Sequence, residues 1–402
     1  MKATTIHTIL LALALPTTAQ TIINSIFING VGSNEWSEDD NWSPADSPGN
    51  SASQQFNVTL PENLTNPVIL DVSRSINTLN VGAGTILNFD NSRSITLTED
   101  LSTNNGSIVF TGTGATGLVF NHLNDEPITL DGSGTLTLTG GSQRFSGPNN
   151  QLLIHGPDHT IQGFSNLGFG VNLGSNDLNF QNQGTITANV ANEILEIDPI
   201  ATFQNTGTVS ATNGGILTFL PGIYSGNGVF EVGDNSEFQS SLLNTLFQGI
   251  TFTANDLDGD PSNNVIRNLF NMDLDDVTFQ SGLTITNDGG NQSFDAIGDV
   301  TNNALIDFTG NGSFTFNHPS DEPITLDGSG TLTLTGGSQR FTGPNNQLLI
   351  HGPDHTIQGF SNLGFGVNLG SNDLNFQNQG TCLLYTSPSP RDQRGSRMPS
   401  SA

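Results

Sequence analysis

The residues best suited to chemistry form one short acidic run, Asn255-Asp256-Leu257-Asp258-Gly259-Asp260. Closely spaced carboxylates on a turn supply the oxygen ligands that calcium prefers. The run departs from an EF-hand loop because its glycine comes early, Pro261 follows at once, and the twelfth position counted from Asp256 is Arg267 instead of glutamate. A solvated acidic loop is therefore the default interpretation. The sharper hypothesis is a looser calcium site whose metal ligands are Asp256, Asp258 and Asp260.

A second candidate is the histidine pair in His155-Gly156-Pro157-Asp158-His159, which recurs as His351 to His355. Two histidines four residues apart share a face in a helix, where they can bind a metal together. Gly156 and Pro157 prevent a helix at this place. We therefore predict a turn between two strands instead of a metal or acid–base site.

The scarcity of basic residues bears on catalysis. The chain has 9 Lys+Arg against 37 Asp+Glu, and without Lys2 and the charged residues after Cys382 only five arginines face 36 acids. Enzymes that cleave polysaccharides on a β-helix need clustered carboxylates, often with a basic partner. We expect a non-catalytic protein, and a carbohydrate-active lyase or hydrolase is the alternative. The negative charge also argues against nucleic acid as a partner.

Hydrophobic residues alternate with polar ones at a period of two. Leu136 and Leu138, for example, lie between threonines, and such runs are bounded by Gly, Asn, Asp and Pro. This pattern predicts short β-strands joined by turns. The segment 182–189 also resembles 205–212, so that Asn182 recurs as Asn205. We predict an all-β fold, a right-handed parallel β-helix (β-solenoid), whose coils of about 20 to 25 residues share one apolar core and stack asparagines at their corners.

A long internal repeat supports this fold. Residues 125–185 recur as 321–381 with an offset of 196, and the two copies differ only at Ser146 and Thr342. If a copy spans whole turns, the offset predicts about nine coils of roughly 22 residues, and about 15 coils in all. An assembly error is the alternative explanation of the identical block. The diverged likeness of 103–105 to 301–303 favours a real duplication.

Residues 1–19 have the features of a signal peptide. Lys2 precedes an apolar run from Ile9 to Leu15, and small residues lead to Ala19. The run is shorter than the roughly 20 residues of a membrane-spanning helix, and no later segment is apolar enough to span. We therefore expect a secreted protein, or one on the outer cell surface. Its single cysteine, Cys382, predicts that no disulfide stabilises it.

Residues 20–60 differ in composition from the repeats of 61–381 and contain both tryptophans, Trp36 and Trp42. We predict that this region is an N-terminal cap over the first coil, since an open solenoid end would promote aggregation. Stacking of either tryptophan on a carbohydrate is the alternative.

The sequence Asn41-Trp42-Ser43-Pro44 and the later Asn-x-Gly-Thr segments resemble large secreted proteins of environmental Gram-negative bacteria. These include autotransporter-like passenger regions and proteins that end in a Pro-Glu-Pro sorting signal (PEP-CTERM type). The resemblance implies a β-helix at or outside the cell surface and carries over no catalytic residues. It favours a structural, adhesin-like repeat protein whose partners are extracellular carbohydrate or other surface proteins. A calcium-dependent binding module is a further alternative, and no other cofactor is expected.

The last segment, 382–402, breaks the pattern. It has three arginines in its final twelve residues and no apolar periodicity. It resembles an in-frame translation of a sequencing-library adapter, so we expect an artefactual tail after Thr381. A natural, disordered basic terminus is the alternative.

Overall fold

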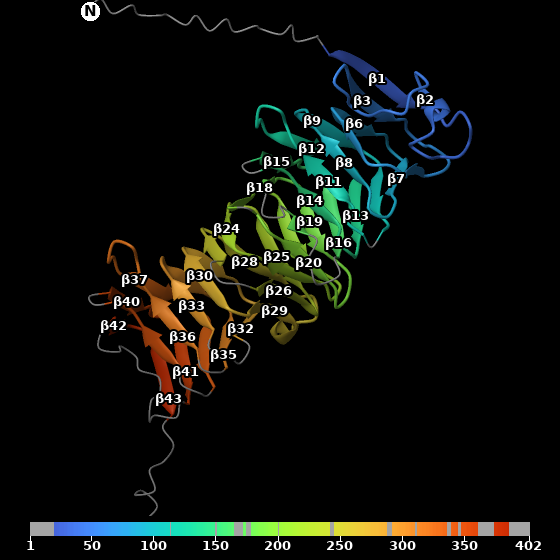
Figure 1. Cartoon of the computed structure of the whole chain (residues 1–402). Coiled ribbons are helices and arrows are strands. Elements are labelled where there is room, and N and C mark those ends of the chain that lie inside the picture. Colours follow the sequence, from blue (N-terminus) through green and yellow to red (C-terminus); the bar gives the residue numbers. More distant parts are fainter. Residues whose placement is uncertain are drawn as a thin grey trace, which may run out of the picture.

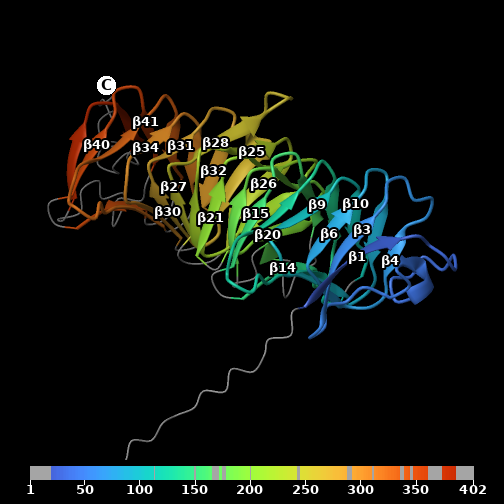
Figure 2. The ribbon, with the colours of Figure 1, turned by 90° about the horizontal axis from the view of Figure 1, so that it is seen from above.

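The computed structural model describes residues 20–112, 114–148, 151–164, 172–173, 178–199, 201–241, 245–287, 292–309, 312–335, 339–344, 347–360 and 374–385. In this part the chain winds through parallel strands that stack as a β-solenoid of about 12 turns. Figures 1 and 2 show the coils following one another along one axis from the blue end to the red end (Figure 1, Figure 2). The predicted all-β solenoid is confirmed. No helix in these ranges has the length and apolar character of a membrane span.

Each turn visits three faces. The first face is a 15-stranded sheet, sheet A. Its strands, in hydrogen-bonded order, are β2 (Trp42–Ser43), β1 (Thr21–Phe27), β3 (Gln54–Leu60), β6 (Thr78–Val81), β9 (Leu101–Asn104), β12 (Ile128–Asp131), β15 (Gln151–His155), β18 (Leu178–Asn182), β21 (Thr202–Asn205), β24 (Gly222–Ser225), β27 (Thr245–Gln248), β30 (Asn271–Asp275), β33 (Ser293–Ala296), β36 (Ser313–Phe316) and β39 (Arg340–Thr342).

The second face is the 14-stranded sheet B. It contains β4 (Val68–Leu70), β7 (Ile86–Phe89), β10 (Ser107–Phe110), β13 (Thr135–Thr139), β16 (Thr160–Phe164), β19 (Thr185–Ala188), β22 (Thr208–Ala211), β25 (Val229–Gly233), β28 (Thr251–Asn255), β31 (Val277–Phe279), β34 (Val300–Asn302), β37 (Ile324–Asp327), β40 (Gln347–His351) and β42 (Leu374–Asn378).

Two sheets share the third face. Sheet C contains β5 (Arg74–Ile76), β8 (Ser94–Leu97), β11 (Gly117–Phe120) and β14 (Arg144–Ser146). Sheet D contains β17 (Asn172–Leu173), β20 (Ile194–Ile197), β23 (Ile216–Phe219), β26 (Ser236–Ser240), β29 (Asn264–Asn268), β32 (Thr284–Asn287), β35 (Leu305–Phe308), β38 (Thr331–Leu334), β41 (Thr356–Phe360) and β43 (Thr381–Tyr385). Two 3-10 turns, η1 (Asp39–Asn41) and η2 (Pro261–Asn263), complete the fold.

The period of two places alternate side chains inside the solenoid, where they stack on the equivalent residue of the next coil. On sheet A, Phe203 is paired with Phe180 on one side and with Tyr224 on the other. The rings of Phe180 and Phe203 are stacked, with centroids 5.4 Å apart. These side chains are fully buried. A single coil cannot enclose such rings, so the core forms only when coils stack.

Asparagines stack at the corners as predicted. Asn182 is paired with Asn205 in the next coil, and its side-chain Nδ2 donates to Asn205 Oδ1 at 2.8 Å. Both are fully buried. The recurrence of Asn182 as Asn205 therefore marks one turn of the solenoid.

The predicted coil length was too uniform. Phe238 is paired with Ile266, and Ile266 is paired in turn with Ile285, so the second of these two coils is about a third shorter than the first. The difference arises because extra residues loop outward at a corner, as 256–263 do before β29, without disturbing the stacked strands. The chain makes about 12 turns, fewer than the number predicted.

The assumption that the repeat spans whole turns was wrong. In the first copy β12 lies in sheet A, whereas the identical strand of the second copy, β37, lies in sheet B. The two are 25 strands apart, which at three strands per turn is eight turns and one further strand. The copies fit on different faces because every face requires the same pattern, with apolar side chains stacked inward and polar residues at the corners.

The N-terminal region lies at one end of the solenoid. Strand β1 extends sheet A beyond β3, and β2 pairs antiparallel with β1 through Phe27 and Trp42. Trp36 packs on Trp42, with ring centroids 4.7 Å apart. Both tryptophans are buried, at 0% and 1% exposure, so neither indole face is open to a ligand. Their burial argues against carbohydrate stacking, and the cap remains a prediction.

Two predicted segments fall largely outside the described residues. These are the signal peptide, 1–19, and residues 386–402 of the predicted tail. Residues 382–385 belong to β43, which pairs with β41.

Candidate functional site

Four successive turns between sheets B and D form a groove of about 600 Å³. These turns follow β19, β22, β25 and β28, so the groove runs across neighbouring coils. We call this feature the turn groove. It is lined by Ala191, Asn192, Thr212, Asn213, Gly214, Gly233, Asp234, Asn235, Asn255 and Leu257.

Three of the lining asparagines occupy equivalent turns and share an unusual backbone. Asn192, Asn213 and Asn235 have φ angles of 61°, 55° and 59°, a left-handed conformation that asparagine tolerates better than most residues. All three are exposed. Within the described part of the chain their side-chain amides make no hydrogen bond. Each therefore offers a donor and an acceptor to a molecule in the groove.

Small residues keep the floor of the groove low. At Gly214 (φ 78°) a Cβ atom would lie 3.2 Å from Ala191 Cβ, and at Gly233 it would lie 3.3 Å from the carbonyl oxygen of Ala211. Both approaches are tighter than ordinary van der Waals contact. Glycine at these two turns therefore allows the coils to stack closely and adds no side chain to the groove.

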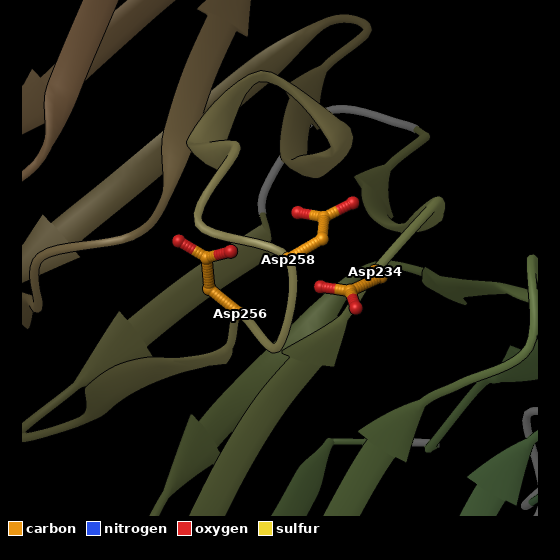
Figure 3. Close-up of side chains that lie close together, drawn as sticks. All are labelled: Asp234, Asp256 and Asp258. Carbon is orange, nitrogen blue, oxygen red and sulfur yellow. The ribbon is translucent and has the colours of Figure 1, made fainter.

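One end of the groove meets a cluster of three carboxylates, Asp234, Asp256 and Asp258, which we call the acidic cluster. Ligand oxygens from the three lie within 4.8 Å of one another. Figure 3 shows Asp234 on the preceding turn, across from the loop that carries Asp256 and Asp258 (Figure 3). At this separation each pair of charges repels by about 1 kcal/mol even in water. A divalent cation would relieve that repulsion, and carboxylate oxygens suit calcium.

Backbone N–H groups position the acidic cluster. Gly259 N donates to Asp256 Oδ1 at 2.7 Å, and Asp260 N donates to Asp258 Oδ1 at 2.9 Å. Leu257 N donates to Asp234 Oδ1 at 3.1 Å, which ties the loop to the preceding coil. Calcium takes six to eight oxygens, so three carboxylates would form only part of its ligand set.

The structure brings together two of the three predicted calcium ligands. Asp256 and Asp258 are in the acidic cluster, whereas Asp260 lies outside it and accepts hydrogen bonds from Ser262 N at 3.0 Å and Ser262 Oγ at 2.6 Å. These hydrogen bonds lower the pKa of the Asp260 carboxyl. Asp260 thus caps η2. The third member, Asp234, was not predicted.

Comparison of the chain with protein-family models, with curated proteins and with solved structures finds no match.

The histidine pair lies in a turn, as predicted, but inside the solenoid. His155 ends β15 and His159 precedes β16, and both are fully buried. His155 Nε2 lies 2.9 Å from His159 Nδ1. His155 Nδ1 lies 2.7 Å from Asn182 Oδ1, and His159 Nε2 lies 3.0 Å from Asn104 Nδ2. The turn is therefore one link in a buried chain of four side chains.

The direction of this chain is fixed by its ends. Asn182 uses its Nδ2 to donate to Asn205, so its Oδ1 must accept from His155 Nδ1–H. His155 Nε2 is then bare and accepts from His159 Nδ1–H, and His159 Nε2 accepts from the Asn104 amide. Every donor has one acceptor only when both imidazoles are neutral.

Burial enforces the neutral state. It lowers the pKa of His155 to about 4 and, together with the neighbouring His155, lowers the pKa of His159 to about 3. In the second copy burial and His351 lower the pKa of His355 to about 4. These imidazoles stabilise the corner, and they are not poised for acid–base work near neutral pH.

One of two stacked aspartates on the outer face of sheet A has a pKa that is shifted in the opposite direction. Asp273 on β30 is paired with Asp295 on β33. Partial burial and the nearby Asp295 charge raise the pKa of Asp273 to about 6. A neighbouring negative charge in the next coil disfavours the ionised form of Asp273. Asp273 lies on a different face from the turn groove.

The turn groove was not predicted from the sequence, although the spacing of three asparagines indicates it. Asn192, Asn213 and Asn235 follow one another at nearly equal spacing, close to one coil, and Asp234 precedes the last of them. A scan for polar residues at the coil period would have grouped them.

Proposed function

We propose that this protein is a non-catalytic structural protein of the extracellular space or cell surface that works as an adhesin-like rod. The observation that carries the proposal is the stacking of parallel coils, continuous on the faces of sheets A and B, which makes an elongated body with polar residues on its outer surface. On sheet B, for example, Ser107, Thr135, Thr160, Thr185 and Thr208 follow one another in register across five coils. Stacked repeats present extended surfaces of this kind to ligands.

The charge of the rod suits an exposed location. A formal net charge of −28 keeps a protein soluble and disfavours nucleic acid and anionic lipid. Groups repeated along a rigid axis also engage a polymeric partner at several points, which raises avidity without new contacts. Extracellular carbohydrate and other surface proteins are such partners.

Export and adhesion can be tested together. The full-length chain would be produced in a Gram-negative host, and cells and medium would be fractionated and probed with antibody. Retention of the cells on polysaccharide-coated surfaces would be measured in parallel. The variant Leu13→Arg, which places a charge in the predicted apolar segment, should hold the chain inside and abolish adhesion. Retention that is equal for the wild type, the variant and cells without the gene would contradict the proposal.

Incubation with a polysaccharide panel tests the non-catalytic part. We expect no new reducing ends and no unsaturated products. Their appearance would favour the carbohydrate-active enzyme, and Asp273 would then be the first residue to replace because its pKa is raised to about 6.

Calcium-dependent binding is the second candidate function, favoured by the three carboxylates of the acidic cluster. Added calcium should then raise the melting temperature of the full chain, and chelator should reverse the rise. Asp234→Asn should remove the effect, whereas Asp260→Asn should keep it because Asp260 lies outside the cluster. If only Asp260→Asn loses the effect of calcium, the result would instead favour the ligands predicted from the sequence, Asp256, Asp258 and Asp260.

A further inference from the structure

We propose that the turn groove binds a segment of an uncharged polysaccharide. The inference rests on the proposed adhesin function, and it adds the place of binding and the class of ligand.

The spacing of the turns suits a linear sugar chain. Successive coils stack at about 4.8 Å, the distance between neighbouring strands. This distance is comparable to the length that one pyranose ring adds to an extended chain. A polysaccharide that lies along the groove would therefore meet an equivalent turn at each ring. A globular protein partner without stacked coils has no such repeat.

The polar groups of the turn groove match vicinal hydroxyls. Asn192, Asn213 and Asn235 are exposed at successive turns, and each amide can donate to one hydroxyl and accept from its neighbour. Thr212, which precedes Asn213 on the second turn, adds a hydroxyl to the lining. A few convergent polar groups of this kind fix the orientation of a ligand.

Apolar surface is present for the C–H faces of the sugar rings. Leu257 lines the groove with 82% of its surface exposed, and Ala191 lines it from the other end of the four turns. The glycine floor lets a ring approach the backbone closely. The groove thus combines amides with small apolar walls.

The charge of the groove selects against anionic polysaccharides. Its lining contains one carboxylate, Asp234, and no lysine or arginine. The acidic cluster adds Asp256 and Asp258 beside it. A uronate or sulfate group would meet repulsion here, so the ligand is uncharged.

Affinity electrophoresis of the full-length protein tests the inference. Native gels would contain dextran, galactomannan, xylan or a β-glucan as neutral probes, and alginate as the anionic probe. We expect at least one neutral probe to retard the wild type. The double variant Asn213→Asp, Asn235→Asp should weaken retardation at least tenfold, because it removes two amide donors and adds two charges. Aspartate tolerates the left-handed backbone, and circular dichroism would verify the fold.

Asn63→Asp is the matched control. Asn63 is an exposed turn asparagine with φ 55° that lies outside the groove, so its replacement should leave retardation unchanged. The inference is overturned if no neutral probe retards the wild type, or if the folded double variant binds as well as the wild type. Retardation by alginate alone, dependent on calcium, also overturns it and assigns binding to the acidic cluster.

The two proposals fail in different ways. Exported, adherent cells whose purified protein is not retarded by any neutral probe would leave the adhesin function standing without this groove. A chain that is retarded by a neutral probe but stays inside the cell would refute the surface location and keep the groove.

Discussion

Lowering the pH from 7 to 5 should destabilise the coils around the buried histidines. An unfolded histidine has a pKa near 6.5, whereas the pKa is about 4 for His155, about 3 for His159 and about 4 for His355 in the fold. At pH 7 all three are neutral in the fold and mostly neutral in the unfolded chain, so nearly all of the stability is present. As the pH falls below 6.5 these histidines bind protons in the unfolded chain but not in the native chain, so stability is lost.

The magnitude follows from the pKa values. One pKa unit corresponds to 1.36 kcal/mol, so at pH 5 each imidazole destabilises the fold by about 2 kcal/mol, and the three together by roughly 6 kcal/mol. Asp273 acts in the opposite direction. Its pKa is raised to about 6, so its native carboxyl gains a proton first and adds stability below pH 6. Because Asp273 is only half-buried, we expect that gain to stay below about 1 kcal/mol. The histidines win.

Hydrogen exchange with mass spectrometry, corrected for the intrinsic effect of pH, can localise the loss. Peptides over 151–164 should lose far more protection between pH 7 and 5 than peptides over 208–219, where no histidine lies. The double variant His155→Gln, His159→Gln should be less stable at pH 7 and should respond less to pH, by roughly 4 kcal/mol over the same interval. His318→Gln, at a partly exposed histidine, reports what the substitution costs by itself. Equal pH dependence in the wild type and the double variant would refute the reasoning.

Three further predictions concern the stacked core. Asn182→Ala leaves His155 Nδ1 and Asn205 Oδ1 without their partners and should cost about 1–3 kcal/mol for each unpaired buried group. Urea unfolding would measure this loss. Asn227→Ala, at an exposed asparagine, is the control and should leave the free energy of unfolding unchanged. Phe203→Ala, between the rings of Phe180 and Tyr224, should lower stability by about 3–5 kcal/mol, and a melting temperature equal to that of the wild type would contradict the stacked core. A variant that lacks 183–205, one whole coil, should keep the β-sheet circular dichroism and should melt within a few degrees of the wild type. A variant that lacks 183–194 should lose the structure of the neighbouring coils, because the deletion moves outward residues to inward positions.

The sequence predicted those features that depend on local pattern. The period of two, as in Leu136 and Leu138, defined which side chains face inward, and the recurrence of Asn182 as Asn205 defined one coil. Gly156 and Pro157 correctly indicated a turn. Each of these rests on neighbours in the chain or on one exact repeat, so no knowledge of the remaining coils was needed.

Contacts between coils of unequal length could not be predicted in the same way. Asp234 joins Asp256 and Asp258 because it occupies the same turn one coil earlier, yet two adjacent coils can differ in length by about a third. A single average period therefore loses register after a few turns. It also led to the expectation that the repeat offset spans whole turns, which the shift of β12 and β37 between sheets disproves.

The second copy of the repeat builds the same buried chain on a different face. His351 Nε2 lies 2.9 Å from His355 Nδ1, and His355 Nε2 lies 3.0 Å from Asn302 Nδ2. Asn302 precedes the identical block, as Asn104 precedes the first, but at an offset of 198 instead of 196. Asn302, in the diverged flank, thus supplies the one hydrogen-bond partner of His355 that lies outside the copied block. It does so although the chain between the asparagine and the block differs in length between the two copies. A misassembled sequence would satisfy that buried imidazole only by coincidence, so the pairing favours a true duplication whose flank was kept compatible by its core.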